Sequence, residues 1–416
     1  MEPETPSLHA ACGLADAWDL DPGVAFLNHG SFGAAPRPVL EAQARLRRQM
    51  EREPVRFLVR ECEPLLDQSR RALADVVGAD PHDLVFVRNA TTAVNSVLRS
   101  LAFRPGDEIL LTDHAYNACR AAVEYVARRT GARVVTAAVP FPIDSPRQVV
   151  EAVLACTSAR TRLAVLDHIT SPTAVVLPIE DLVRDLACRG VDTLVDGAHT
   201  PGMLPLDLAR LGAAYYAGNC HKWLCAPKGA GFLFVRRDRQ KGIQPAVISH
   251  GYNRPRANRP PLHAAFDWTG TDDPTPWLCV GEAIRFLESL LDGGLPALME
   301  HNHRLAIQAR RLLAGALGCR PPCPESMLGL MAALPLPDDP VETPPVIHPL
   351  STQLLEQYGI EVPVYHWPDP PRLWLRVSAQ AYNRLEQYER LASALAECGC
   401  GLDRQSRLDT SNGEHE

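Results

Sequence analysis

Short apolar runs alternate with helical segments from about residue 84 onward. The runs are rich in Val, Leu, Ile and Phe, as is typical of strands buried on both faces, and they lie at Leu84–Val87, Glu108–Thr112, Arg133–Ala138, Leu163–Asp167, Thr193–Asp196, Ala213–Gly218 and Gly231–Val235. Helical periodicity lies between them at Ala93–Leu101, Ala118–Thr130, Pro146–Ala155 and Ile179–Arg189. This alternation predicts an α/β fold with a mostly parallel sheet flanked by helices.

The pattern changes after about residue 265. A helical stretch over Trp277–Leu317 is followed by a strand-like run over 327–336 between proline clusters, and then by a helix, a strand and a helix at Leu350–Tyr358, Leu373–Val377 and Leu385–Glu397. These elements indicate a smaller C-terminal α+β domain. We therefore expect an N-terminal arm (1–20), a large domain (21–265), a small domain (266–402) and a disordered tail (403–416).

Composition and charge argue against several classes of protein. Hydrophobic residues make up 46% of the 416 positions and charged residues 22%, as in an ordinary globular protein. The formal net charge of −7 argues against a nucleic-acid partner, and the absence of an apolar run of about 18 residues argues against a membrane span. The first residues are acidic and include no basic segment followed by an apolar stretch, so we expect a cytoplasmic protein.

No metal site is expected from the cysteines or histidines. The twelve cysteines are too few for a disulfide scaffold, and none falls into the paired Cys-x-x-Cys spacing of a zinc site. His301 and His303 lie two apart in a helical stretch, which places them on different faces of the helix.

The segment 195–235 carries the strongest chemical signal. One apolar strand ends at Asp196, His199 follows in a loop, and Lys222 comes after the next strand. Ligands of open parallel sheets bind at the carboxyl ends of strands, so these side chains are expected to converge on one pocket. A carboxylate for the pyridine nitrogen and a lysine for a Schiff base are the two groups that pyridoxal 5′-phosphate (PLP) requires. The chain has only three lysines, Lys222, Lys228 and Lys241, which leaves few candidates for an amine nucleophile.

A series of motifs, in a consistent order and spacing over about residues 20–395, resembles one enzyme family. The motifs are FLNHGSFGAAP (26–36), EPVRFLVRE (53–61), FVRNATTAVN (86–95), TDHAYNA (112–118), HITSPTAVVLP (168–178), VDGAHTPG (195–202), AGNCHKWLCAPKGAGFL (217–233), WTGTDDPTPWL (268–278) and LRVSAQAYN (375–383). The chain resembles fold-type I PLP-dependent enzymes of the class V aminotransferase family, and within it the isopenicillin N epimerase-like branch, which also includes carbon–sulfur lyases of natural-product pathways. The resemblance implies a PLP-dependent lyase or isomerase with the two-domain architecture of that fold.

The resemblance implies roles for three residues around the cofactor ring. Lys222 would form the Schiff base, and Asp196 would hold a proton on the pyridine nitrogen so that the ring withdraws electrons. His199 would support the hydrogen bonds beside the ring.

A second set of residues would bind the cofactor phosphate and the phenolic oxygen. Residues 89–92 follow a strand and open a helix, whose free N–H groups attract an anion and are equally suited to a simple N-cap. The contacts implied by the resemblance are Ala90, Thr91, Thr92, Asn219 and His221 on the phosphate, Ser171 on the phenolic oxygen, and Thr271 on the phosphate in the neighbouring subunit of an obligatory homodimer. Relatives commonly carry serine where this chain has Asn219, and an amide can also donate to phosphate.

The substrate side involves a further group of residues. Arg376, at the end of a predicted strand, would bind the α-carboxylate of an amino-acid substrate through a bidentate pair. Asn28 and His29 would line the substrate side. Tyr116 is our first choice for the residue that stacks on the ring or relays a proton, and His114 is the second.

The expected reaction begins when Lys222 removes the Cα proton of an amino acid. Loss of a β-sulfur group, reprotonation on the opposite face and proton transfer to the cofactor then correspond to lysis, epimerisation and transamination. A cysteine desulfurase of this group needs a thiol before the arginine strand, and residues 360–376 contain no cysteine.

We favour β-elimination from a cysteine S-conjugate in secondary metabolism such as antibiotic biosynthesis. An amino-acid epimerase of the isopenicillin N epimerase type is the alternative. An aminotransferase and a PLP-fold protein that binds ligand without turnover are further alternatives, although proteins of the last kind commonly lack the lysine or the aspartate. The sequence leaves the identity of the substrate open.

Overall fold

The computed structural model describes residues 14–254, 256–337, 347–368 and 372–401. The predicted tail (403–416) and most of the predicted arm (1–20) lie outside these residues. Within the described ranges, no helix has both the length and the apolar composition needed to cross a membrane. The same ranges bring no three His, Cys, Asp or Glu side chains together in a way that could hold a metal ion.

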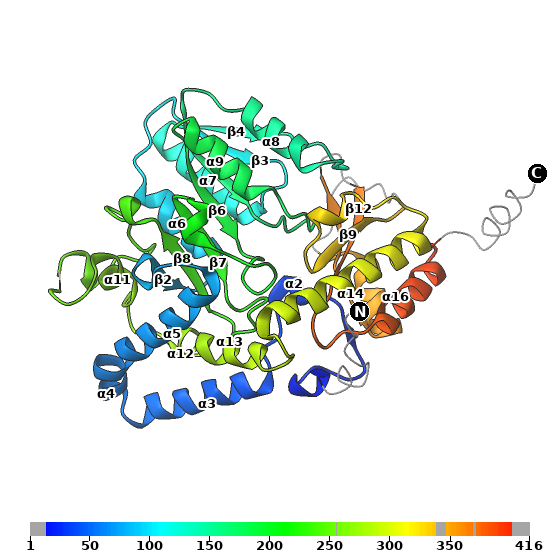
Figure 1. Cartoon of the computed structure of the whole chain (residues 1–416), viewed down its shortest axis with the longest axis horizontal. Helices are drawn as coiled ribbons and strands as arrows, with labels where there is room; N and C mark the ends of the chain where they lie inside the picture. The colour runs from blue at the N-terminus through cyan, green and yellow to red at the C-terminus, as the bar shows by residue number, and fades with distance from the viewer. Residues whose placement is uncertain (1–13, 255, 338–346, 369–371, 402–416) are drawn as a thin grey trace, which may run out of the picture.

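A seven-stranded sheet forms the centre of the larger unit (Figure 1). In spatial order its strands are β2 (Leu84–Val87), β8 (Gly231–Val235), β7 (Tyr215–Asn219), β6 (Asp192–Gly197), β5 (Thr161–Asp167), β3 (Glu108–Thr112) and β4 (Arg133–Ala137). Neighbouring strands run parallel, except that β8 is antiparallel to both β2 and β7. The seven predicted strands are therefore present in a mostly parallel sheet, as the sequence indicated.

Helices cover both faces of this sheet, and alternate strand residues pack into two separate cores. One core joins the strands to α5 (Cys62–Val77), α8 (Pro146–Ala155) and α9 (Ile179–Cys188). The other core joins them to α6 (Ala90–Ser100) and α7 (Asn117–Thr130). Because both faces are buried, the middle of each inner strand is apolar, and polar residues are found mainly at strand ends and in the edge strand β4. The predicted α/β fold class is thereby confirmed.

The smaller unit is built on a three-stranded antiparallel sheet in the order β11 (Val364–Trp367), β12 (Arg372–Ser378), β9 (Met331–Pro335). Its helices share one hydrophobic core with this sheet, and they are α14 (Gly294–Leu317), α15 (Pro349–Tyr358) and α16 (Leu385–Glu397). Helices α14 and α16 lie side by side on the sheet (Figure 1).

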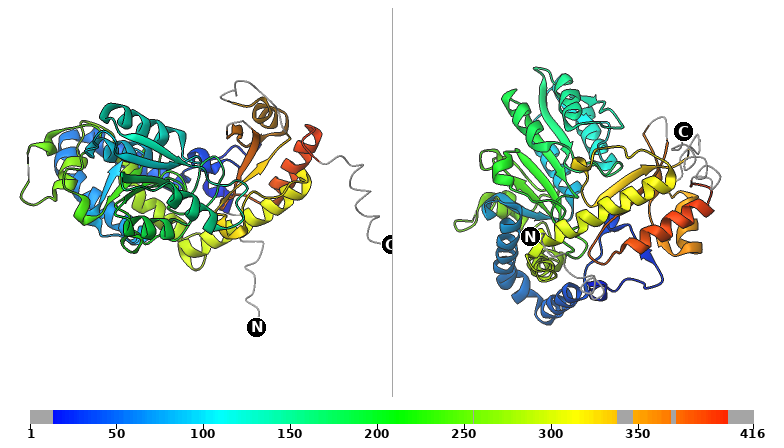
Figure 2. Two further views of the ribbon diagram at one scale, coloured as in Figure 1. Left: turned by 90° about the horizontal axis from the view of Figure 1, so that it is seen from above. Right: turned by 45° about the vertical axis from the view of Figure 1, so that its right-hand side comes forward.

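A segment from near the N-terminus packs with the smaller unit. Strand β1 (Ala25–Phe26) pairs in parallel with β10 (Ile360–Glu361), and Ala25 and Leu27 are buried in the core of the smaller unit. The short helix α2 (His29–Phe32) follows and lies between the two units (Figures 1 and 2). The N-terminal segment is thus placed where both units meet.

The predicted helical stretch over Trp277–Leu317 consists of three helices instead of one. Helices α12 (Thr275–Leu278) and α13 (Val280–Glu288) pack against α3 (Arg37–Arg52) and α5 of the larger unit, and α14 follows. The break before α14 falls at Gly293, whose φ of 93° is accessible mainly to glycine. The first half of α14 packs into the core of the larger unit and the second half into that of the smaller unit, so this helix bridges them.

The remaining elements are short. They are η1 (Ala15–Ala17), α4 (Pro54–Arg56), η2 (Phe57–Glu61), η3 (Pro81–Asp83), α10 (Leu208–Leu211), η4 (Arg237–Arg239), η5 (His250–Tyr252), α11 (Pro261–Phe266) and η6 (Glu325–Met327).

Candidate active site

Three adjacent strands of the central sheet end at one edge with polar side chains. Asp167 ends β5, Asp196 lies beside it on β6, and Asn219 ends β7. The loop after β7 carries Lys222, whose Nζ lies 3.1 Å from Nε2 of His199. The structure therefore brings the predicted lysine and histidine together at the carboxyl ends of the strands.

The surroundings of Lys222 favour a neutral amine. Burial and then the positive charge of Arg376 lower the pKa of Lys222 from 10.5 to about 7, against the opposing effect of Asp196. Burial and then the charge of Lys222 hold the pKa of His199 well below 6.5, so this ring is neutral. A neutral imidazole beside an amine that loses its proton near neutral pH suits a lysine nucleophile.

Both oxygens of Asp196 accept a hydrogen bond from the protein. Oδ1 accepts the N–H of Ala198 at 3.0 Å, and Oδ2 accepts the S–H of Cys119, in the first turn of α7, at 3.0 Å. The carboxylate is buried and therefore held in one orientation. Cys119 was not identified from the sequence, where it reads as one more apolar position of a helix.

The start of α6 combines a helix cap with two free donor groups, both on Thr91. Asn89 caps the helix, since its Oδ1 accepts the N–H of Thr92 at 2.8 Å and the hydroxyl of Thr92 at 3.0 Å. The N–H of Ala90 donates to Oδ1 of Asn219 at 2.8 Å. The N–H and hydroxyl of Thr91 are left without an acceptor in the described part of the chain, so Thr91 is the best placed of the predicted phosphate contacts.

His221 can contact a phosphate only in one protonation state. Its Nδ1–H donates to the carbonyl of Ala230 at 2.8 Å, which leaves Nε2 as an acceptor in the neutral ring. Burial lowers the pKa of His221 to about 4. Donation to a phosphate therefore needs a second proton, which a nearby phosphate dianion would favour.

Arg376 is a buried guanidinium with no carboxylate partner among the described residues. Nη1 donates to the carbonyl and, at 3.3 Å, to the hydroxyl of Ser171, and Nη2 donates to Oγ of Ser31 at 2.9 Å. Nε has no acceptor in the described ranges. A buried cation that is paired only with neutral groups is costly, and an anionic ligand would relieve that cost.

The structure gives Ser171, Asn28 and His29 contacts that the sequence did not suggest. Ser171 accepts from Arg376. Asn28 accepts the hydroxyl of Ser31 at 2.5 Å and donates to Glu361 at 3.0 Å, so it supports Arg376 indirectly. His29 is fully buried, where Nδ1 meets the hydroxyl of Tyr382 at 2.7 Å and Nε2 donates to the carbonyl of Lys222 at 3.0 Å. Both ring nitrogens of His29 are thus engaged, Nε2 with the lysine loop and Nδ1 with Tyr382 of the smaller unit.

Tyr116 and His114 have different surroundings. Tyr116 is the N-cap of α7 and is 43% exposed; burial, Cys119 and Asp196 raise its pKa, while Arg376 opposes this shift. His114 is fully buried, and its Nδ1 is hydrogen-bonded to the hydroxyl of Thr173 at 2.7 Å. The centre of its ring lies 4.5 Å from the centre of the Trp367 ring. Tyr116 therefore shares its electrostatic environment with Asp196 and Arg376, and His114 packs into an aromatic cluster.

Thr271 is exposed in the loop between α11 and α12. The next two residues tie this loop to the body of the larger unit, since Asp272 pairs with Arg88 and Asp273 pairs with Arg47 at 2.8 Å. Its prediction as a contact to a neighbouring subunit remains a prediction.

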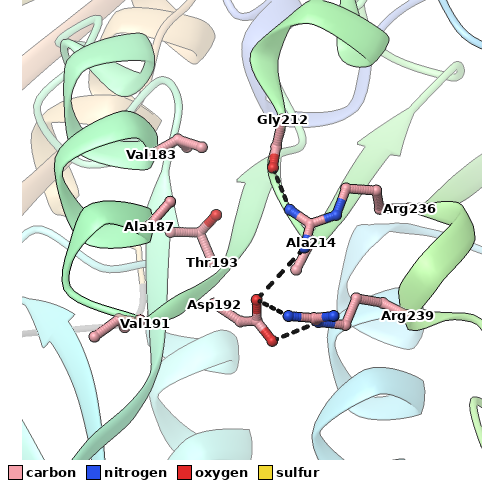
Figure 3. Close-up of a pocket in the computed structure, with 10 residues that line it drawn as sticks. Val183, Ala187, Val191, Asp192, Thr193, Gly212, Ala214, Arg236 and Arg239 are labelled. Carbon is pink, nitrogen blue, oxygen red and sulfur yellow. Dashed lines mark hydrogen bonds and ion pairs between the residues drawn. The ribbon is translucent and has the colours of Figure 1, made fainter.

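The cavity drawn in Figure 3 lies away from this cluster. It is lined by the start of β6, including Asp192, whereas Asp196 lies at the other end of the same strand. Asp192 is ion-paired with Arg239 at 2.7 Å, and Arg236 is paired with Asp238 at 2.7 Å. Because these charges are already matched, we do not consider this cavity a catalytic site.

The side chains at the strand ends fit PLP. Asp196 offers a buried carboxylate for the ring nitrogen, Lys222 an amine for the aldehyde, and Thr91 free donors for the phosphate. Nδ1 of His199 is buried without a partner among the described residues, as expected of a group that a bound ligand would satisfy.

Sequence comparisons agree with this chemistry. The family model described as "Aminotransferase class-V" matches residues 34–333. An isopenicillin N epimerase of Streptomyces clavuligerus is 38% identical over 390 residues, covering 90% of this chain and 95% of the epimerase. A putative L-cysteine desulfhydrase of Oryza sativa subsp. japonica is 34% identical over 405 residues, covering 90% of this chain and 83% of that protein. The relatives therefore include both classes of activity predicted from the sequence.

Solved structures agree on the fold. The cystine C–S lyase C-DES, in complex with its product cysteine persulfide, has a TM-score of 0.74 at 24% identity and covers 90% of this chain and 98% of its own. Another C-DES structure, with glycine covalently linked to its PLP cofactor, has a TM-score of 0.76 at 24% identity. The match covers 94% of this chain and 100% of the C-DES chain. The predicted fold-type I architecture is confirmed. Since the family model matches most of the chain and relatives above 30% identity align along nearly all of it, this chain belongs to the class-V aminotransferase family of PLP-dependent enzymes.

Proposed function

We propose that the protein removes the Cα proton of an amino acid and eliminates a sulfur group from the β-carbon, with a cysteine S-conjugate of secondary metabolism as its substrate. Two side chains that act on each other electrostatically carry this proposal. Lys222 is an amine of lowered pKa, and Arg376 is a buried guanidinium that has no acidic partner among the described residues. Bound PLP supplies the electron-withdrawing ring that stabilises negative charge at Cα.

Arg376 binds and orients the substrate in this proposal. Its terminal nitrogens now donate to Ser171 and Ser31, which are neutral acceptors that a carboxylate can replace with charge-assisted hydrogen bonds. A carboxylate held there keeps Cα within the space shared with Lys222, whose neutral amine takes the proton. His199 accepts a hydrogen bond from the amine at 3.1 Å and holds it at the carboxyl ends of the strands.

The distribution of bases favours elimination over epimerisation. An epimerase needs an acid–base group on each side of Cα, whereas an elimination needs one base. His114 is fully buried, with its Nδ1 hydrogen-bonded to Thr173 and its ring packed against Trp367. Tyr116 remains, but burial raises its pKa, so its conjugate base is costly to form. Lys222 is therefore the base that we assign to the removal of the proton, with His199 accepting a hydrogen bond from its amine.

The relatives support a sulfur leaving group and also the alternative. Several L-cysteine desulfhydrases and a hercynylcysteine sulfoxide lyase are similar to this chain, and their names describe carbon–sulfur chemistry. The isopenicillin N epimerases favour epimerisation as the second candidate and support a place in antibiotic biosynthesis. A persulfide mechanism has no cysteine in residues 360–376 to carry it.

We propose further that the protein is a cytoplasmic homodimer whose active site is completed by Thr271 of the neighbouring subunit. Apolar side chains that are exposed in the single chain support an interface, among them Val55 (67% exposed), Val59 (71%) and Val247 (59%).

Incubation with an S-alkyl-L-cysteine in deuterated water tests the function directly. We expect equal amounts of pyruvate and ammonia to form, and the Lys222→Ala variant to form neither. Recovery of inverted substrate that carries deuterium at Cα, without pyruvate, would instead establish the epimerase.

A further inference from the structure

A second buried carboxyl group lies beside Asp196. Asp167 ends β5, and in the parallel register of β5 and β6 its Cα pairs directly with that of Asp196. Adjacent strands lie about 4.8 Å apart and paired side chains point to the same face, so the two carboxyl groups are neighbours. Both residues are 4% exposed.

The hydrogen bonds of the two carboxyl groups differ. Asp196 accepts an N–H and an S–H, each at 3.0 Å, and its negative charge acts on Lys222. Asp167 accepts the N–H of Tyr116 at a longer 3.3 Å. A negative charge is therefore better stabilised on Asp196 than on Asp167.

The surrounding charges cannot support two carboxylates. Two adjacent buried carboxyl groups do not both ionise at neutral pH, because each charge opposes the other. Two cations act on the pair: Arg120 of α7 acts on Asp167, and Lys222 acts on Asp196. The nearby side chains of Tyr116 and Cys119 are neutral. Burial and then the charge of Asp196 raise the pKa of Asp167 well above 3.8.

The pair also fixes the start of α7. Tyr116, the N-cap, donates its N–H to Asp167, and Cys119, one turn inside the helix, donates its S–H to Asp196. The backbone that carries Tyr116 into the site is thus attached to the same two side chains that lie at the base of the site.

We propose that Asp167 is a neutral carboxylic acid in the holoenzyme and a positioning residue, which confines the negative charge to Asp196 and holds the start of α7. The inference rests on the proposed function, because it is Asp196 that would meet the cofactor ring. It assigns a role to a residue that no motif or pocket singled out.

Three variants test this inference: Asp167→Asn, Asp167→Ala and Asp196→Asn. Each is loaded with PLP, and two quantities are measured: the dissociation constant of PLP and the pH midpoint at which the visible absorbance of the bound cofactor changes. Circular dichroism and thermal unfolding report whether each variant is folded.

An amide replaces a neutral acid with little change, so Asp167→Asn should keep the PLP dissociation constant within about threefold and the midpoint within about half a pH unit. Asp167→Ala leaves the N–H of Tyr116 without its acceptor and should weaken PLP binding about 10- to 100-fold, as is typical when a supporting partner of a binding group is lost. Asp196→Asn removes the charge itself and should weaken binding further and move the midpoint.

A midpoint shift of more than about one unit in Asp167→Asn means that Asp167 is ionised, and this overturns the inference. Wild-type behaviour of Asp167→Ala overturns the positioning role. If Asp167→Ala does not fold, the midpoint of Asp167→Asn still decides the charge state. If the wild-type protein binds no PLP, both the proposed function and the inference fail. If the wild-type protein forms pyruvate but the pH midpoint of Asp167→Asn is shifted, only the inference fails.

Discussion

At the scale of residues, the site is made of charges that burial has altered. Burial lowers the pKa of Lys222 to about 7. Arg376 is a buried cation that has no acidic partner among the described residues. Both features cost folding free energy in the protein without ligand. The aldehyde of PLP would relieve the cost at Lys222, and the carboxylate of an amino acid would relieve the cost at Arg376.

Replacing Arg376 by lysine tests carboxylate binding. The variant keeps the positive charge but loses the planar pair of donors, so kcat/KM for the amino-acid substrate should fall about 100-fold. Arg372→Lys, at an exposed position of the same strand, is the matched control and should leave kcat/KM within about twofold. Equal kinetics for the two variants would contradict the role of Arg376.

The pH dependence of PLP attachment tests the state of Lys222. The pKa of about 7 means that the amine is neutral above pH 7 and becomes protonated as the pH falls through that value. The rate at which apoprotein attaches PLP, followed by stopped-flow absorbance, should rise with pH and reach a plateau above about pH 8. A rate that keeps rising tenfold per unit through pH 9 would indicate an ordinary exposed lysine.

The roles of individual residues could be predicted where one side chain has one chemical use. Lys222 and Asp196 follow from strand ends and from the scarcity of lysine. Ser31 and Cys119 could not be singled out, because their contacts join residues far apart in the chain, and Asp167 was overlooked. Asp167 did carry a usable signal, since it ends a predicted strand next to the one that ends at Asp196.

At the scale of elements, the lysine loop is held by the N-terminal segment. His29 of α2 donates to the carbonyl of Lys222 at 3.0 Å. Gly33, just after α2, has a φ of 69°, and a Cβ there would lie 2.3 Å from the carbonyl oxygen of His221. The loop position therefore depends on close backbone contact between segments that are distant in sequence.

Gly33→Ala should displace the lysine loop. We expect a loss of about 3 kcal/mol in the free energy of unfolding and reduced PLP occupancy, because the methyl group meets backbone that has little freedom to move. Gly190→Ala is the control: its φ is 73°, but its Cβ would meet nothing within 4 Å, so it should cost only about 1 kcal/mol of backbone strain. Urea unfolding and absorbance measure both effects, and equal losses would argue against the contact at Gly33.

The strands were predictable because both sheet faces are covered, which makes the buried part of each inner strand a short apolar run. The antiparallel direction of β8 could not be predicted, because an apolar run reads the same whether the strand is parallel or antiparallel to its neighbours. The pairing of β1 with β10 depends on where the smaller unit packs, and two residues give no periodic signal.

At the scale of the whole molecule, the site lies where the two units meet. Lys222 and Asp196 come from the larger unit, Arg376 comes from β12 of the smaller unit, and Ser31 joins them from the N-terminal segment. Figure 2 shows that segment between the units. Relative placement of the units therefore sets the distance between the amine and the guanidinium.

Mixed dimers test the shared site. In the proposed dimer, Lys222→Ala and Thr271→Ala subunits together form one site with both defects and one intact site. Random pairing of equal amounts makes half of the dimers mixed, and one of the two sites in each mixed dimer is intact. The two variants should therefore regain up to about a quarter of wild-type activity when they are unfolded and refolded together, in addition to any activity that each retains alone. Activity equal to the sum of the separate variants would show that Thr271 does not act across the interface.

The most direct test of the central claim is to reduce the PLP-loaded protein with borohydride and to map the labelled peptide by mass spectrometry. We expect the cofactor to be attached to Lys222 and not to Lys228 or Lys241, which are both exposed. Attachment to either of those lysines, or no covalent attachment at all, would show that Lys222 is not the Schiff-base lysine.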